Sequence, residues 1–193
     1  ADGTVGAWTA TTGLSAGRQA ATAVADTGGL FVCGGWNGTA NLSAVEVAPL
    51  SASGTVVTAL GGWAAMSSFA TLRVNHASVA HRGSLYVLGG FGSTYLDDVQ
   101  LAAIGANGTL GPWAATASFP TPRRGHTSVA HDGFLYLLGG LGAGGLLADA
   151  QVAAINADGT LGPWAATTSF PTPRQEHTSL VHNGSLYVLG GRA

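Results

Sequence analysis

The sequence has no lysine, a single cysteine and few charged residues. Its basic side chains are seven arginines, which face nine acidic residues and leave a formal net charge of −2. Nucleic-acid binding requires clustered positive charge, so we expect no nucleic-acid partner. The lone Cys33 cannot form an intramolecular bridge, which argues against a disulfide scaffold and against a cysteine-based zinc site.

Long apolar runs are missing as well. The chain is 46% hydrophobic and 8% charged, which excludes intrinsic disorder, yet no apolar run reaches the roughly 18 residues of a membrane-spanning helix. We therefore expect a soluble, folded chain with no membrane span. The first residues, Ala1 to Thr4, lack the pattern of a signal peptide, so either none exists or it has been removed.

An internal repeat is the main feature that is present. The segments 107–140 and 158–191 align without gaps and are identical at 25 of 34 positions. Three markers recur at matching intervals along the chain: Trp8, Trp63, Trp113 and Trp164; Arg18, Arg73, Arg123 and Arg174; Gly35, Gly90, Gly140 and Gly191. A sequence repeat of about fifty residues predicts a fold built from similar structural units that follow one another along the chain.

Each repeat contains four short segments that are typical of antiparallel strands, labelled a to d here. In the third copy these are 126–131, 135–138, which we expect to end at Gly139-Gly140, 148–155, and a last segment around Trp164. Asp132-Gly133 between the first two favours a tight hairpin turn. The four repeated tryptophans are expected to act as wedges between neighbouring sheets.

These features resemble the kelch-repeat family. The resemblance rests on Pro173-Arg174, on His177, on the segment 186–191 (LYVLGG) and on the tryptophan that opens strand d. It implies an all-β fold, a kelch-type β-propeller of four-stranded antiparallel blades. The predicted repeats are 13–69, 70–119, 120–170 and an incomplete 171–193, with 1–12 as the outer strand of a preceding or closing blade, all within one domain, 1–193.

The predicted propeller does not close within this chain. About four blades are present, and the last supplies only strands a and b, so strand c is missing between Gly191 and Val5. Either the chain is a fragment of a longer propeller, which we favour, or copies assemble through the open edges. If the chain is a fragment, its partners are the further blades of the same protein. If copies assemble, the partners are other copies of the chain in a homo-oligomer.

The d–a and b–c loops should emerge on one face of such a fold, and loops on a rigid scaffold commonly carry recognition. The candidate binding residues on these loops are Trp36, Phe91, Tyr95, Arg73, Arg123, Arg124, Arg174 and Glu176. The repeated arginines are expected rather to hold loops or to pair with Asp97, Asp98 or Asp149 between blades. The repeated histidines, such as His126 and His131, are expected to satisfy hydrogen bonds within their own repeat.

Catalysis is not favoured. The sequence offers no catalytic constellation, no metal site and no cofactor motif, and Cys33 lies in a strand expected to be buried rather than in a crosslinked cofactor. We expect a non-catalytic binding or scaffold module whose ligand is a protein or a glycan. The alternatives are a carbohydrate-active enzyme, resembling a sugar isomerase or oxidase, whose site needs further blades, and a self-assembling structural protein. The lysine-free composition suggests a bacterial protein that is extracellular or on the cell surface.

Overall fold

The computed structural model describes residues 7, 10, 12–26, 29–50, 62–106 and 108–193, and these residues form fifteen strands and no helix. Most of the predicted outer strand 1–12 lies outside the described residues. The all-β prediction is confirmed. The repeat limits drawn from the sequence stay predictions.

Three sheets each contain four consecutive antiparallel strands, as predicted for kelch blades. The first blade contains β1 (Thr22–Asp26), β2 (Gly29–Trp36), β3 (Asn41–Ala48) and β4 (Ala64–Met66); the second contains β5 (Ala77–His81), β6 (Ser84–Phe91), β7 (Tyr95–Ala103) and β8 (Ala114–Thr116). The third contains β10 (Thr127–His131), β11 (Phe134–Gly142), β12 (Gly145–Ala154) and β13 (Ala165–Thr167), with the short β9 (Arg123–Arg124) on β11. The fourth has only β14 (Thr178–His182) and β15 (Ser185–Leu189).

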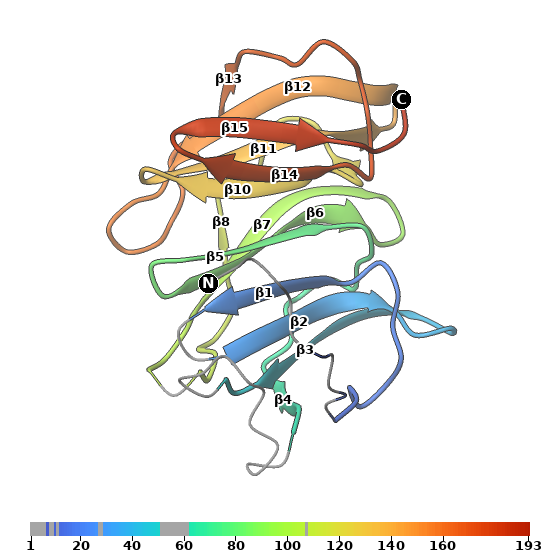
Figure 1. The fold of residues 1–193 in the computed structure, drawn as a ribbon, viewed down its shortest axis with the longest axis vertical. Helices are drawn as coiled ribbons and strands as arrows, with labels where there is room; N and C mark the ends of the chain where they lie inside the picture. Colours follow the sequence, from blue (N-terminus) through green and yellow to red (C-terminus); the bar gives the residue numbers. More distant parts are fainter. Residues whose placement is uncertain (1–6, 8–9, 11, 27–28, 51–61, 107) are drawn as a thin grey trace.

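The blades follow one another along an arc. The first strand of each blade lies innermost, so that β1 contacts β5, β5 contacts β10 and β10 contacts β14 (Figure 1). Among the described residues, the sheet of β14 and β15 pairs with no other sheet, and the ring is open between the fourth blade and the first. The prediction that the blades do not close is confirmed.

The a–b turns follow the predicted chemistry. In the third blade, His131 pairs with Phe134 across a two-residue turn in which Asp132 has φ 48° and Gly133 has φ 79°. Two consecutive positive φ angles define the tight turn whose twist matches that of the flanking strands. The hairpin predicted from Asp-Gly is therefore confirmed.

The expected end of strand b is wrong. β11 continues past Gly139-Gly140 to Gly142, with a bulge between Leu138 and Gly140. Both glycines have positive φ, 53° and 101°, which a bulge can use and a flat strand cannot. The glycine pair therefore bends the strand, and strand b extends into the loops that carry the candidate residues.

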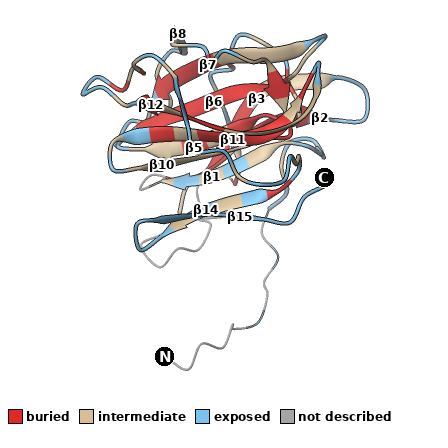
Figure 2. Cartoon of the chain, turned by 90° about the horizontal axis from the view of Figure 1, so that it is seen from above, coloured by how far each residue is buried: buried red, intermediate tan, exposed pale blue. Residues whose placement is uncertain are grey.

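The hydrophobic core lies between the blades. One cluster joins Phe31, Val45 and Phe69 of the first blade to Leu85 and Val87 of the second, and a second cluster joins the second blade to the third. Figure 2 shows buried residues along the central strands of the first three blades, whereas β14 and β15 are mostly half-buried or exposed. Each blade is thus stabilised mainly by its neighbours.

Two of the repeated tryptophans bridge neighbouring blades. Trp113, at the outer strand of the second blade, donates from Nε1 to the carbonyl oxygen of Ser67 at 2.8 Å and packs edge-on against Phe69. Trp164 repeats this arrangement on Ala117 and Phe119. The predicted wedge role is confirmed for both residues, while Trp8 lies outside the described residues.

Candidate functional site

The repeated arginines connect one blade to the next. The backbone N–H of Arg73 donates to the carbonyl oxygen of Leu42 in the first blade, at 3.0 Å. Its guanidinium reaches into the second blade, where it donates to Asp98 at 2.8 and 2.6 Å and to the carbonyl oxygen of Gly89 at 2.8 Å. A bidentate pair of this kind is both strong and directional. The arginine therefore fixes the loop between the two blades.

Arg123 repeats these contacts with Asp149 and Gly139 in the third blade. The predicted pairing of arginines with Asp98 and Asp149 is confirmed. Both guanidinium groups have no solvent exposure, so their donors face the protein interior. Ligand contact by Arg73 and Arg123 stays a prediction. It would require the buried guanidinium groups to become exposed to solvent.

The acid partner shifts position in the first blade. Arg18 pairs there with Glu46, which also accepts hydrogen bonds from the backbone and hydroxyl of Ser15. Glu46 lies opposite Val32 on strand b, the register position that Gln100 and Gln151 occupy in the next two blades. Strand c therefore supplies a carboxylate to the arginine in each of the three complete blades.

Hydrogen bonds control the ionisation of these carboxylates. Partial burial alone raises the pKa of Asp98, but hydrogen bonds from Arg73 and Gln100 outweigh it and hold the pKa below its usual value. Asp149 follows the same pattern with Arg123 and Gln151. Both carboxylates are therefore ionised at neutral pH, as the pairing requires.

Three candidate residues meet in one cluster on the loop face, which we define as the surface formed by the b–c loops (36–41, 91–95, 142–145) and the d–a loops (70–75, 120–125, 171–176). Phe91 and Tyr95 pack edge to face, with ring centroids 5.4 Å apart. The guanidinium of Arg124, from the next d–a loop, lies 5.3 Å from the first ring and 5.8 Å from the second. These contacts confirm that the two sets of loops share one face.

The other candidate residues lie on the same face but outside this cluster. Trp36 is 38% exposed, and its neighbour across the b–c loop, Asn41, donates to the carbonyl oxygen of Gly92 at 3.3 Å. Glu176 forms an exposed ion pair with Arg192 at 3.0 Å. Arg174 donates to the carbonyl oxygens of Gly190 and Thr172.

An apolar hollow beside the cluster was missed by sequence reasoning. It has a volume of about 490 Å³ and is lined by Asn41, Ala70, Thr71, Leu72, Gly92, Ser93 and Leu96. Leu72 is 51% exposed, unusually high for a large apolar side chain. The later copies have Pro122 and Pro173 at this repeat position. The leucine in place of a repeated proline is the sequence signal that could have indicated the hollow, because a residue that departs from the repeat serves something other than the common scaffold.

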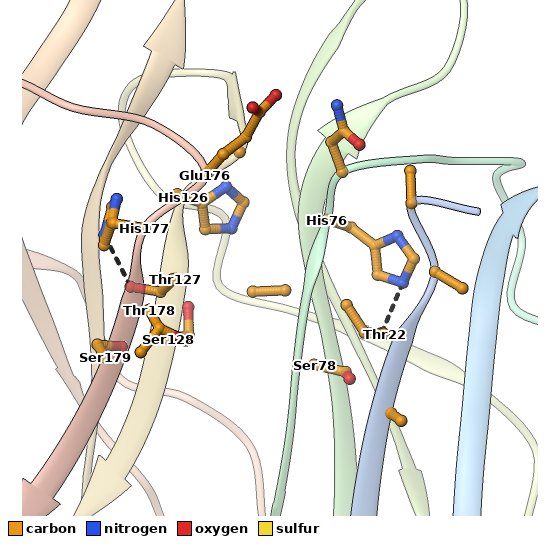
Figure 3. A pocket seen from close by; sticks show the side chains of 16 residues that line it. Thr22, His76, Ser78, His126, Thr127, Ser128, Glu176, His177, Thr178 and Ser179 are labelled. Carbon is orange, nitrogen blue, oxygen red and sulfur yellow. Dashed lines mark hydrogen bonds between the residues drawn. The ribbon is translucent and has the colours of Figure 1, made fainter. Parts of the chain in front are cut away.

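The inner strands line a polar channel of about 500 Å³, shown in Figure 3. His76 Nε2 forms a hydrogen bond of 2.9 Å with Oγ1 of Thr22, and His177 Nε2 forms the same bond with Thr127. Each bond joins a histidine to the preceding blade. The prediction that these histidines bond within their own repeat is therefore wrong: they link blades.

The equivalent bond is missing for His126. The matching position in the preceding blade is Ala77, which has no hydroxyl, and Nε2 of the buried His126 has no hydrogen-bond partner. Burial, together with the charge of Arg123, lowers its pKa to about 3, so the ring is neutral. The middle of the channel wall thus contains an imidazole with unused hydrogen-bonding capacity.

Replacing Ala77 with threonine is expected to stabilise the fold by about 1 kcal/mol, because the new hydroxyl would lie where Thr22 and Thr127 lie in their blades. Urea unfolding measures this change. The matched controls T22A and T127A should each lose a similar amount. An Ala77→Thr variant that is no more stable than the parent, beside controls that lose stability, would contradict the assignment of the orphaned ring.

Within the part of the chain that the structure describes, no three histidine, cysteine or acidic side chains are grouped to hold a metal ion. Cys33 is fully buried, and burial raises the pKa of its thiol to about 12, which keeps it protonated. No helix among the described residues is long and apolar enough to cross a membrane.

Comparison with known families agrees with this geometry. Residues 62–193, which are 132 of the 193 in the chain, match the family described as the KLHDC2/KLHL20/DRC7 Kelch-repeats domain. The chain belongs to the kelch-repeat family. No curated protein matches the sequence. Kelch-repeat domains bind protein partners, so family membership indicates a protein-interaction module.

Proposed function

We propose that this kelch-repeat chain is a non-catalytic module that recognises a segment of a partner protein through its loop face. The observation that supports the proposal most strongly is the adjacency of two features. One is the Arg124 guanidinium, which lies beside the rings of Phe91 and Tyr95; the other is the hollow beside Leu72 and Leu96. Aromatic residues and arginine are the types most enriched among energetically dominant interface residues.

The two features select different groups of a partner. The hollow suits a bulky apolar side chain, because its walls include two leucines, one of which, Leu72, is 51% exposed. No hydrogen bond is found for the terminal guanidinium nitrogens of Arg124 among the described residues, although its Nε is buried. Its donors therefore suit a carboxylate or a backbone carbonyl of the partner. A segment that combines an apolar residue with an acidic one fits both.

A peptide-display library tests this proposal. Peptides selected on the chain should combine a bulky apolar residue with an acidic residue. Arg124→Ala and Phe91→Ala should each weaken the best peptide by at least about tenfold, the effect of a central interface residue. Isothermal titration calorimetry measures the loss, and thermal melts confirm that the variants fold.

The matched control is Phe134→Ala. Phe134 is 42% exposed and follows the a–b turn at the opposite end of the blade, so its loss should leave peptide affinity within about twofold. Peptides that bind the two loop-face variants as tightly as the parent, or that depend on Phe134, would show that recognition occurs elsewhere. Glycan binding, a bacterial source and an extracellular location stay predictions from the sequence.

A further inference from the structure

A second hollow, which we call the turn pocket, lies between the second and third blades at the end opposite the loop face. It has a volume of about 200 Å³, and its two walls are residues within 81–86, at the a–b turn of the second blade, and 155–159, at the c–d turn of the third. The hydroxyl of Tyr86 joins the walls by donating to the carbonyl oxygen of Gly159 at 2.6 Å. Both blades have all four strands, so the pocket lies between two complete sheets.

Arg82, on the first wall, departs from the turn chemistry of the other blades. The first residue of this turn is Asp132 in the third blade and Asn183 in the fourth, and all three residues have φ 48°. Asparagine and aspartate tolerate this left-handed conformation, whereas an arginine is strained there. A strained residue that also departs from the repeat indicates a role other than making the turn.

The same replacement leaves the neighbouring His81 without an acid. In the third blade, Nε2 of the equivalent His131 lies 3.2 Å from Oδ2 of Asp132. Nε2 of His81 is shielded from solvent and has no hydrogen-bond partner. Burial and the charge of Arg82 lower the pKa of His81, although Asp26 opposes them. An anion beside Arg82 and His81 would replace the carboxylate that the third blade supplies from its own turn.

The second wall carries the opposite charge. Oδ1 of Asp158 accepts hydrogen bonds from the hydroxyl and the backbone N–H of Thr160, at 2.6 and 2.9 Å, and these bonds lower the pKa of its carboxyl. Among the described residues, Asp158 forms no salt bridge with Arg82. Ile155 and Ala157 add apolar surface to the same wall. The pocket therefore has a cationic wall and an anionic wall that do not neutralise each other.

We propose that the turn pocket binds a free α-amino acid with a small apolar side chain, its carboxylate against Arg82 and His81 and its ammonium against Asp158. The proposal is independent of the loop face, because it uses no residue of that surface. A guanidinium and an imidazole N–H suit a carboxylate, and a carboxylate suits an ammonium.

The size and charge of the pocket set limits on the ligand. Its volume of about 200 Å³ is below the roughly 300–1,000 Å³ that drug-sized ligands occupy, so a smaller molecule fits. A dianion such as phosphate is disfavoured, because Asp158 would repel it. An amino acid satisfies both walls, and its side chain lies against Ile155 and Ala157.

L-Valine is the probe that tests the proposal on the full chain. Two analogues of similar size each lack one charge: isovalerate has no ammonium, and L-valinamide has no carboxylate. Isothermal titration calorimetry should show saturable binding of valine, with each analogue at least about tenfold weaker, because hydrogen bonds between charged groups are lost.

Two variants assign the two walls. Asn183 shows that asparagine fits this turn, so Arg82→Asn should unfold at the same urea concentration as the parent or a higher one, while valine binds at least about tenfold more weakly. In Asp158→Asn, valine and isovalerate should bind within about twofold of each other, because the ammonium has lost its acid. The matched control Phe134→Ala, beside the corresponding turn of the third blade, should leave valine affinity within about twofold.

Three results would overturn the proposal. The first is a parent chain that does not bind valine. The second is isovalerate that binds the parent as tightly as valine does, because the anionic wall would then have no role. The third is valine affinity that survives in Arg82→Asn.

Discussion

Replacing Gly89 with alanine is expected to lower the free energy of unfolding by about 4 kcal/mol, through a strained backbone and overpacking together. Gly89 has φ 52°, a conformation that costs a residue with a Cβ roughly 1–2 kcal/mol. The added Cβ would also lie 2.7 Å from Cζ of Phe119 and 3.0 Å from the carbonyl oxygen of Arg123. Both groups belong to the segment leading into the next blade, so the clash separates two blades.

Gly133→Ala is the matched control. Gly133 has φ 79°, but a Cβ there would meet no atom within 4 Å, so only the backbone cost of roughly 1 kcal/mol remains. Urea unfolding of both variants measures the difference. Equal losses in the two variants would show that the glycine pair serves only the bulge, and that close approach of the blades is not required.

Lowering the pH from 7 to 4.5 is expected to cost the fold roughly 5 kcal/mol through His76 and His126 together. Burial, with the charge of Arg73, lowers the pKa of His76 to about 3, and burial with Arg123 does the same for His126. In the unfolded chain both rings bind a proton below about pH 6.5. The stability from the neutral rings is therefore present above that pH and is lost progressively as the pH falls toward 3.

The histidine window begins at higher pH than that of the carboxylates. The pKa values of Asp98 and Asp149 are lowered by their hydrogen bonds, so their contribution is present above the ordinary aspartate range and is lost only below about pH 4. A loss of stability that begins near pH 6 consequently reports on the histidines. Denaturant unfolding at half-unit pH steps resolves the two windows.

A glutamine variant assigns the histidine effect. His76→Gln should make the pH dependence shallower by about one proton, because one buried titrating ring is removed. A proton NMR titration of the folded parent provides a second readout, in which the rings of His76 and His126 stay neutral to below pH 4. If the ring of His76 or His126 titrates near pH 6.5 in the folded protein, the account is contradicted.

The repeat made the architecture predictable, because residues at equal intervals must occupy equivalent positions in equivalent sheets. The antiparallel blades, the Asp132-Gly133 turn and the pairing of Arg123 with Asp149 all follow from that equivalence. So does the open fourth blade, since counting strands in the last repeat ends at strand b.

What could not be predicted concerns contacts between repeats. A period shows that His76 and His126 are equivalent, but not that each ring faces the blade before its own. The bulge at Gly139 was missed for a related reason: a double glycine is compatible with a strand end or with a bend, and only the neighbouring blade decides between them. Leu72 belongs to no recognisable sequence motif. Its importance follows from the hollow that the adjacent loops enclose, which the sequence alone does not show.

Hydrogen exchange on the complex with the best displayed peptide tests the central claim, recognition through the loop face, most directly. The account predicts slower exchange at the b–c and d–a loops around Phe91, Leu72 and Arg124, with no change at the a–b turns near Gly83 and Gly133. Protection confined to the a–b turns, with the loops unaffected, would contradict it.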